Sequence, residues 1–284
     1  MLQLPGNDVT SDFDLDAYFA RIGYSGPRSP TIDTLEAIHA CHPQAIPFEN
    51  LNPLLHWPVR LDAASLQQKL VREGRGGYCF EQNLLLYHAL QALDFKVTGL
   101  AARVLWNAEG AVRARSHMLL LVDLNGGPYV ADVGFGGLTL TAPLRLATDI
   151  EQATPHEPFR LTQVDGGLML EARIESAWKG LYIFDLQPQA LADYELPNWY
   201  LCNHPESHFL AAVVAARVDR DRRFALRNAD FAVYYPHRAA ERRTLINGSE
   251  IRRTLEDVFQ IQVPAEPEVN ALFERLAGLS AATT

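Results

Sequence analysis

Cys79 has the sequence context of a reactive thiol. Gly76 and Gly77 precede it, and an apolar run with helical spacing follows it, which places the thiol at the start of a helix. The unpaired backbone N–H groups and the dipole at a helix N-terminus favour an anion, and the thiolate is the nucleophilic form of cysteine. The same N–H groups could stabilise a tetrahedral oxyanion. The alternative, a small buried hydrophobic residue, is how we interpret Cys41 and Cys202, because no glycine turn precedes either one.

A cysteine nucleophile needs a base, and the base needs a group that orients it. His117 begins one apolar run and Asp132 lies in the next, with Asn125-Gly126 between the two runs as a strong signal for a β-hairpin. A two-residue turn there places His117 opposite Gly134, so that Asp132 lies diagonal to it on the same face. A hydrogen bond between the two side chains is therefore feasible. The alternative is a histidine at a strand end and an aspartate entering a turn, without contact.

The glycine-rich run that follows Asp132 does not match a nucleotide-binding loop. Gly134-Phe135-Gly136-Gly137 lacks the Gly-Lys-Ser/Thr ending of a P-loop and precedes no clear helix. It either lets the backbone approach a substrate or forms a corner of a barrel. His39 and His42 are three residues apart, but the sequence has no Cys-x-x-Cys or His-Glu-x-x-His motif. No metal site is predicted, and we expect His39 to pack on its helix.

The elements that must position these residues change type along the chain. Helical spacing predicts helices at residues 15–22, from about 31, at 63–72 and at 80–93. Strand patterns follow at 97–106, 118–124, 129–133, 159–164 and 168–174. The last third mixes strands at 210–218, 223–229 and 231–235 with helices at 250–259 and 266–276. This order predicts an α+β protein of about three packed units, with an antiparallel sheet that closes into a barrel.

The composition is that of a folded protein with an acidic surface. The 284 residues are 48% hydrophobic and 21% charged, with a net charge of -9, which argues against nucleic-acid and anionic-membrane partners. Three sparse cysteines argue against a disulfide framework and fit a reducing compartment. We find no pattern of a signal peptide or of a membrane span, and the expected location is cytoplasmic. The sequence indicates no oligomeric state.

Several segments resemble the signatures of the arylamine N-acetyltransferase family. In chain order they are Tyr18-Phe19-Ala20-Arg21-Ile22-Gly23-Tyr24, Ile46-Pro47-Phe48-Glu49-Asn50-Leu51, Arg75-Gly76-Gly77-Tyr78-Cys79-Phe80-Glu81-Gln82-Asn83, Ser116-His117-Met118, Ala131-Asp132-Val133-Gly134-Phe135-Gly136, Asn198-Trp199-Tyr200 and Ser207-His208-Phe209. The resemblance covers nearly the whole chain, and only the last few residues, from about 278, match no signature.

The resemblance implies the fold and the site together. It implies a helical bundle over residues 1–92 with the nucleophile, an antiparallel β-barrel over 93–192 with the histidine and aspartate, and an α/β lid over 193–284, around a core like that of the cysteine proteases. It assigns the catalytic triad to Cys79, His117 and Asp132. The other implied residues are Phe48, Phe135 and Phe209 in the acceptor pocket, Gly134 and Gly136 near the cofactor, and Arg75 with Glu49 as a structural ion pair. We add Trp106 as a cofactor contact, with core packing as the alternative.

The resemblance also implies an activity. Acetyl-CoA is the expected donor, and arylamines, hydrazines and arylhydroxylamines are the expected acceptors, in a ping-pong reaction through an acetyl-cysteine and without a metal. One alternative is an amide synthase of the same fold that closes a macrolactam. Papain-like proteases and transglutaminases use the same order of residues, but the papain signature around the cysteine is absent. A binding module without activity predicts a broken triad, whereas all three residues are present.

Overall fold

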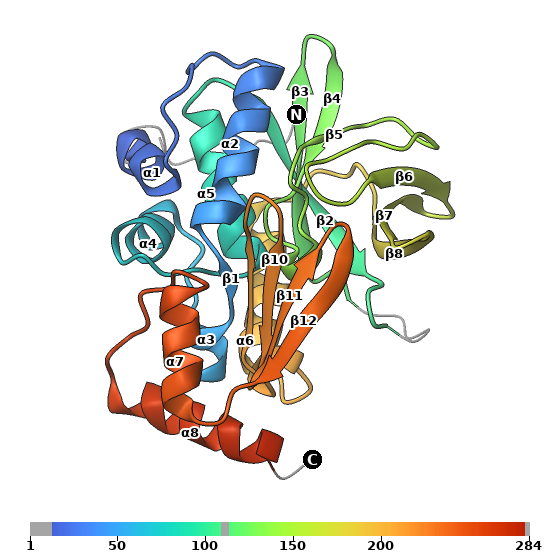
Figure 1. The fold of residues 1–284 in the computed structure, drawn as a ribbon. Coiled ribbons are helices and arrows are strands. Elements are labelled where there is room, and N and C mark those ends of the chain that lie inside the picture. The colour runs from blue at the N-terminus through green and yellow to red at the C-terminus, as the bar shows by residue number, and fades with distance from the viewer. Residues whose placement is uncertain (1–12, 109–113, 282–284) are drawn as a thin grey trace.

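Four helices of the N-terminal third, α1, α2, α4 and α5, lie together on one side of the molecule (Figure 1). The computed structural model describes residues 13–108 and 114–281. The helices of this third are α1 (Leu15–Ile22), α2 (Ile32–Ala45), α3 (Leu51–Leu54), α4 (Ala63–Leu66), which continues as a π-helical stretch (Gln67–Arg72), and α5 (Cys79–Gln91). Side-chain caps define two of the starts, because Asp14 accepts from the N–H of Ala17 and Thr31 accepts from the N–H of Thr34.

The middle of the chain forms a seven-stranded antiparallel sheet that curls into a nearly closed barrel (Figure 1). Its spatial order is β5 (Leu144–Arg145), β4 (Gly127–Ala131), β3 (His117–Leu124), β2 (Lys96–Val104), β8 (Ala177–Phe184), β7 (Gly167–Ile174) and β6 (Phe159–Val164). Isolated bridges from Thr148 to Leu161 and from Gln152 to Phe159 link the segment after β5 to β6. These bridges bring the two edges of the sheet together. The α+β class with a central barrel is thus confirmed.

The C-terminal third forms a second antiparallel sheet covered by helices. The sheet runs β1 (Phe48–Glu49), β9 (Val214–Val218), β10 (Arg223–Arg227), β11 (Asp230–Tyr235) and β12 (Arg238–Thr244), with α6 (Leu191–Asn203), α7 (Gly248–Asp257) and α8 (Pro267–Ala281). The strand β1 comes from the N-terminal third and pairs with β9 through Phe48 and Ala216. The division at residues 92 and 192 stays a prediction. No helix within residues 13–108 and 114–281 is long and apolar enough to cross a membrane.

The packing places α5 between the helices and the barrel. Buried Leu84 and Leu85 of α5 share one hydrophobic core with Leu120 and Val122 of β3. A second core fills the inside of the barrel, and a third lies between the C-terminal sheet and the helices α7 and α8. Burial of these apolar side chains is the main stabilising contribution to such contacts. Because α5 lies on β3, the first residue of the helix and the first residue of the strand are held in one region.

Part of the predicted element list is wrong in detail. The predicted strand 210–218 begins at Val214, because the preceding residues His208–Leu210 form a 3-10 turn whose N-cap Ser207 accepts from the N–H of Phe209. The longer elements β8, α6 and β12 were not predicted, and neither were the short elements β1, α3 and β5. The hairpin with Asn125-Gly126 at its turn is confirmed, since Leu124 pairs with Gly127. Its ladder ends at the pair of Leu120 and Ala131, before the expected pairing of His117 with Gly134.

Candidate active site

Cys79 is the first residue of α5. Its neighbour Tyr78 is in an extended conformation, and the Oε2 atom of Glu81 accepts from the backbone N–H of Tyr78 at 3.1 Å. Lys69 Nζ donates to the other carboxylate oxygen of Glu81 at 2.7 Å, so the start of the helix is fixed by a buried acidic side chain. The cysteine is 5% exposed, and its Sγ atom lies 3.5 Å from the carbonyl oxygen of Ser116. The thiol therefore lies at a helix N-terminus, next to the start of β3.

His117 and Asp132 are in direct contact, as the hairpin argument allowed. The Nε2 atom of His117 lies 2.7 Å from Oδ2 of Asp132, and both side chains are buried. The hydroxyl of Tyr182 donates to the same Oδ2 at 2.9 Å. The other carboxylate oxygen, Oδ1, accepts from Asn83 Nδ2 and from the N–H of Gly134, each at 2.9 Å. Four donors thus surround one buried carboxylate. Their hydrogen bonds stabilise the negative charge, which burial alone would disfavour.

The charges of this pair follow from its burial and its contacts. Burial alone would lower the pKa of His117, but the charge of Asp132 and the hydrogen bond to it outweigh burial, with a further contribution from Cys79, and raise the pKa to about 10. Burial alone would raise the pKa of Asp132, but His117, Asn83 and the N–H of Gly134 lower it overall. At neutral pH the geometry therefore favours an imidazolium beside a carboxylate. Because Nε2 binds Asp132, Nδ1 is the ring nitrogen that remains for the thiol.

Three residues of this site were not assigned to it from the sequence. Asn83 lies one helical turn after Cys79, and this spacing of four residues was the available signal. Tyr182 gave no signal, because its strand β8 was not predicted. His39 was expected to pack on its helix, yet its Nε2 atom accepts from the backbone N–H of Asp132 at 3.2 Å. The aspartate thus collects contacts from α2, α5 and β8, which no local sequence pattern reveals.

Gly134 lies against the backbone of the nucleophile. A Cβ atom at this position would come within 2.8 Å of the Cα atom of Cys79, 3.0 Å of its carbonyl oxygen and 2.7 Å of Asn83 Nδ2. Only a residue without a side chain fits such an approach. The loop that follows Asp132 is therefore in contact with the first turn of α5. By contrast, a Cβ atom at Gly137 would meet no atom within 4 Å.

Aromatic rings surround the region of the triad. The ring of Phe135 lies edge-on to His117 at 5.1 Å between centroids, and the ring of Tyr182 lies 4.8 Å from it. Phe48 and Phe209 form an edge contact at 6.1 Å. Of the three phenylalanines expected to line an acceptor pocket, Phe135 contacts His117, whereas Phe48 and Phe209 contact each other. The acceptor pocket itself stays a prediction.

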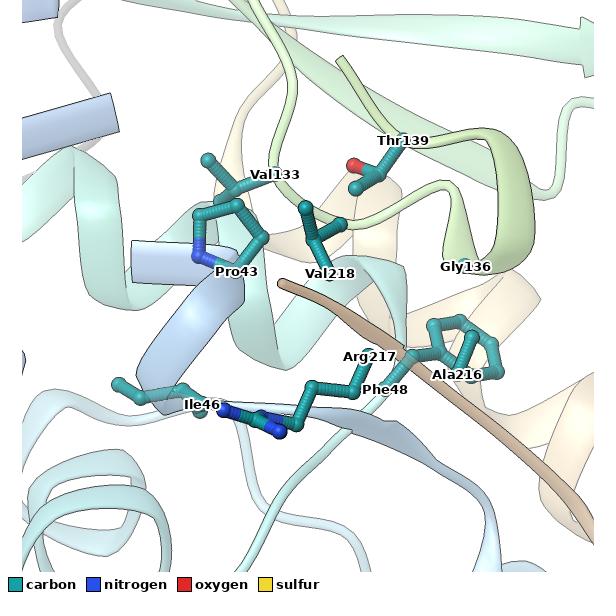
Figure 2. Close-up of a pocket in the computed structure, with 9 residues that line it drawn as sticks. All are labelled: Pro43, Ile46, Phe48, Val133, Gly136, Thr139, Ala216, Arg217 and Val218. Atoms are coloured by element: carbon teal, nitrogen blue, oxygen red, sulfur yellow. The ribbon is translucent and has the colours of Figure 1, made fainter. Parts of the chain in front are cut away.

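Figure 2 shows a small recess that borders this region. Its lining comes from α2 and the residue that follows it, from β1 and β9, and from the loop after Asp132. The lining residues are Pro43, Ile46, Phe48, Val133, Gly136, Thr139, Ala216, Arg217 and Val218. They include Phe48 and Gly136 but none of the three triad residues, so we do not identify the recess with the acceptor pocket.

The remaining predicted site residues have separate places. Arg75 Nη2 and Nε donate to Oε1 of Glu49 at 2.7 and 3.1 Å, and both side chains are buried. Burial would raise the pKa of Glu49, but Arg75 and Lys69 lower it overall. Trp106 packs against the barrel core and donates its backbone N–H to Leu181. This placement agrees with the core-packing alternative. Within the described ranges, no group of three or more His, Cys, Asp or Glu side chains is arranged to hold a metal ion.

Comparisons with known proteins agree on one family. A family model described as N-acetyltransferase matches residues 31–269. An arylamine N-acetyltransferase of Mycobacterium tuberculosis is 41% identical, over 94% of this chain and 96% of the relative. An arylamine N-acetyltransferase / N-hydroxyarylamine O-acetyltransferase of Salmonella typhimurium is 38% identical, over 93% of this chain and 88% of the relative. The structure of the Mycobacterium marinum arylamine N-acetyltransferase in complex with CoA matches with a TM-score of 0.90 and 38% identity, over 93% of this chain and 99% of that chain.

Proposed function

Because the chain belongs to the arylamine N-acetyltransferase family of acyltransferases, we propose that it transfers the acetyl group of acetyl-CoA to an acceptor through an acetyl-cysteine at Cys79. The proposed acceptors are arylamines, hydrazines and arylhydroxylamines. The observation that carries the proposal is the contact of His117 with Asp132 at 2.7 Å beside a thiol at the start of α5. We propose these three residues as the catalytic triad. The CoA complex of the relative from Mycobacterium marinum supports the choice of donor.

In the first half-reaction Cys79 is the nucleophile. Its thiolate attacks the carbonyl carbon of the thioester, and the developing oxyanion lies near the unpaired N–H groups of the first turn of α5. The intermediate collapses by breaking the bond between the carbon and the CoA sulfur. The imidazolium of His117 supplies the proton for the CoA thiolate, and Asp132 stabilises the imidazolium before that transfer. The products of this half are CoA and acetyl-Cys79.

In the second half-reaction the acceptor nitrogen or oxygen attacks the acetyl carbon. His117 is now neutral and accepts the proton that the acceptor loses, while the bond between carbon and the Cys79 sulfur breaks. The thiolate and the imidazolium are thereby restored. Arylamines suit this step because they are neutral at pH 7 and still nucleophilic, whereas an alkylammonium must first lose its proton. We propose Phe48, Phe135 and Phe209 as the wall that holds the aromatic acceptor.

The loop after Asp132 is the part of the site that we propose to lie along the donor. Gly134 lies directly against the backbone of Cys79 without a side chain between them, and Gly136 has a φ of 78°, which favours glycine. This arrangement fits the narrow approach that a pantetheine arm needs to reach a buried thiol. The acceptor range follows the relative from Salmonella typhimurium, whose name includes both N-acetylation of arylamines and O-acetylation of N-hydroxyarylamines.

Steady-state kinetics test the proposal. Initial rates of N-acetyl product, measured against acetyl-CoA at several arylamine concentrations, should give parallel double-reciprocal lines. Cys79→Ala should abolish the reaction, and the matched control Cys41→Ala should retain it. A hydrazide should also be acetylated, whereas an alkylamine should react far more slowly at pH 7. Intersecting lines, or product formation by Cys79→Ala, would refute the ping-pong mechanism. Inability of the wild type to use acetyl-CoA would favour the amide synthase alternative.

A further inference from the structure

The backbone of Asp132 is held by side chains and not by a strand. The ladder between β3 and β4 ends at Ala131, one residue earlier. Beyond it the N–H of Asp132 is bound by Nε2 of His39 at 3.2 Å, and the carbonyl oxygen of Asp132 accepts from the hydroxyl of Thr139 at 3.1 Å. Both partners are buried. The two backbone groups that would set the direction of the Asp132 side chain therefore depend on α2 and on the loop after β4.

His39 makes this contact in one protonation state. Since Nε2 accepts a hydrogen bond, it carries no proton, and the proton of the neutral ring lies on Nδ1. Burial lowers the pKa of His39 to about 4, although the charge of Asp132 acts in the opposite direction, so that the neutral ring is the form present at pH 7. The Nδ1 atom is buried and has no hydrogen-bond partner among the described residues.

The unpaired Nδ1–H argues against a role in packing alone. A buried donor without a partner is unfavourable, and an apolar side chain of similar volume would fill the same place without that cost. Within the described chain, the ring's hydrogen bond to another residue is the one with the backbone N–H of Asp132. We therefore attribute the presence of a histidine at position 39 to the hydrogen-bond acceptor that its Nε2 atom provides for Asp132.

We propose that His39 is a positioning residue for the acyl transfer. By fixing the backbone N–H of Asp132, it directs the carboxylate to His117 and so maintains the pair that activates Cys79. This inference rests on the proposed function, because it assigns His39 a task in the same site. It acts through Asp132 and does not touch the substrate. Thr139, which binds the carbonyl oxygen of the same residue, is the second half of the arrangement.

The chain permits a matched set of substitutions at His39. In His39→Gln the terminal oxygen can reach the place of Nε2 and accept from Asp132. In His39→Asn the amide reaches only the place of Nδ1, where no partner exists, and His39→Leu has no acceptor. His88→Gln, which removes a half-buried histidine in α5, is the control. A packing role would rank the variants by volume, whereas the proposed role ranks them by the acceptor.

Two readouts separate this inference from the proposed function. One is the rate of Cys79 alkylation by iodoacetamide against pH, which needs no acyl donor. The other is the single-turnover rate of acetylation by acetyl-CoA. We expect His39→Leu and His39→Asn to slow acetylation about tenfold and to lower the rate of Cys79 alkylation at pH 7 relative to the wild type. His39→Gln should recover most of the rate, and His88→Gln should match the wild type in both readouts.

The opposite result would overturn the inference. If His39→Leu or His39→Asn behaved like the wild type, or if His39→Gln were as slow as His39→Leu, the acceptor would have no role in positioning. A wild type that acetyl-CoA does not acetylate would refute the proposed function, and the alkylation series would still test His39. Should the His39 variants fail to fold, Thr139 supplies the same test: Thr139→Val should reproduce the defect and Thr139→Ser should not, and equal rates of the two would refute the arrangement.

Discussion

At the scale of single residues, the site depends on how closely the loop after Asp132 approaches Cys79. From the sequence we expected Gly134 to lie near the cofactor. The structure shows that it lies on the backbone of the nucleophile, with room for no Cβ atom. The role of a glycine as a spacer between two chain segments is invisible in the sequence, because the segment it approaches lies 55 residues earlier (134 less 79).

Substitution of Gly134 tests this contact. Gly134→Ala places a methyl group 2.8 Å from the Cα atom of Cys79, so that one of the two segments must move. We expect a loss of about 1–3 kcal/mol in the free energy of unfolding and a large loss of acetylation rate. Gly137→Ala, where the same methyl group meets no atom within 4 Å, is the control and should retain both. Equal behaviour of the two variants in urea unfolding and in acetylation would show that the contact is unimportant.

At the scale of elements, a helix or strand could be predicted from the sequence where its own residues form a regular local pattern. The hairpin of β3 and β4 was predictable down to its register, because Asn125-Gly126 selects a two-residue turn between apolar runs. The helix α6 was missed because Pro197 interrupts it and because Leu196 and Trp199 are exposed, so that it has no clear polar face. The strand β8 begins with Ala177-Trp178-Lys179-Gly180, which lacks a regular alternation.

Two buried histidines of α2 make the free energy of unfolding depend on pH. His39 and His42 are buried, and burial lowers their pKa values from 6.5 to about 4 and about 3. Since the unfolded chain binds these protons near pH 6.5 and the folded chain does not, the two histidines contribute stability that is present above pH 6.5 and is lost as the pH falls toward 4. His117 does not oppose this loss, because its raised pKa contributes stability that is already complete below pH 6.5.

Urea unfolding at pH 7 and pH 5 measures this effect. We expect each of the two histidines to contribute a loss of about 2 kcal/mol between these pH values. His42→Gln has no titratable ring, and its stability should therefore fall by about 2 kcal/mol less than that of the wild type over the same interval. A variant whose loss equals that of the wild type would mean that His42 is not held neutral in the folded chain.

At the scale of the whole molecule, one short segment connects the first and last thirds of the chain. After β1, the Nδ2 atom of Asn50 donates to the carbonyl oxygens of Phe209 and Ala212 at 3.0 and 2.9 Å. Its Oδ1 atom accepts from the N–H of Val214 at 2.7 Å. The buried amide thus satisfies three backbone groups of the C-terminal third and holds Phe209 beside Phe48. The family resemblance predicted both phenylalanines, but the amide that places one next to the other could not be read from a local pattern.

Removal of this amide should affect stability and acceptor binding together. Asn50→Leu leaves three buried backbone groups unpaired, and we expect a loss of about 3 kcal/mol or more in the free energy of unfolding. Because Phe209 then loses its anchor, KM for an arylamine should rise more than kcat falls. Asn203→Leu in α6, which removes an exposed amide bonded within its own helix, is the control. Unchanged KM in Asn50→Leu would contradict the link between this amide and the acceptor wall.

The central claim is that Cys79 carries the acetyl group between donor and acceptor. The most direct measurement is the intact mass of the protein mixed with acetyl-CoA alone, followed by a second measurement after an arylamine is added. We predict one acetyl group per chain after the first mixing, absent in Cys79→Ala and retained in Cys41→Ala, and its disappearance in the second mixing with one equivalent of N-acetyl product. A protein that forms product without ever carrying the acetyl group, or that carries it equally in Cys79→Ala, would contradict the account.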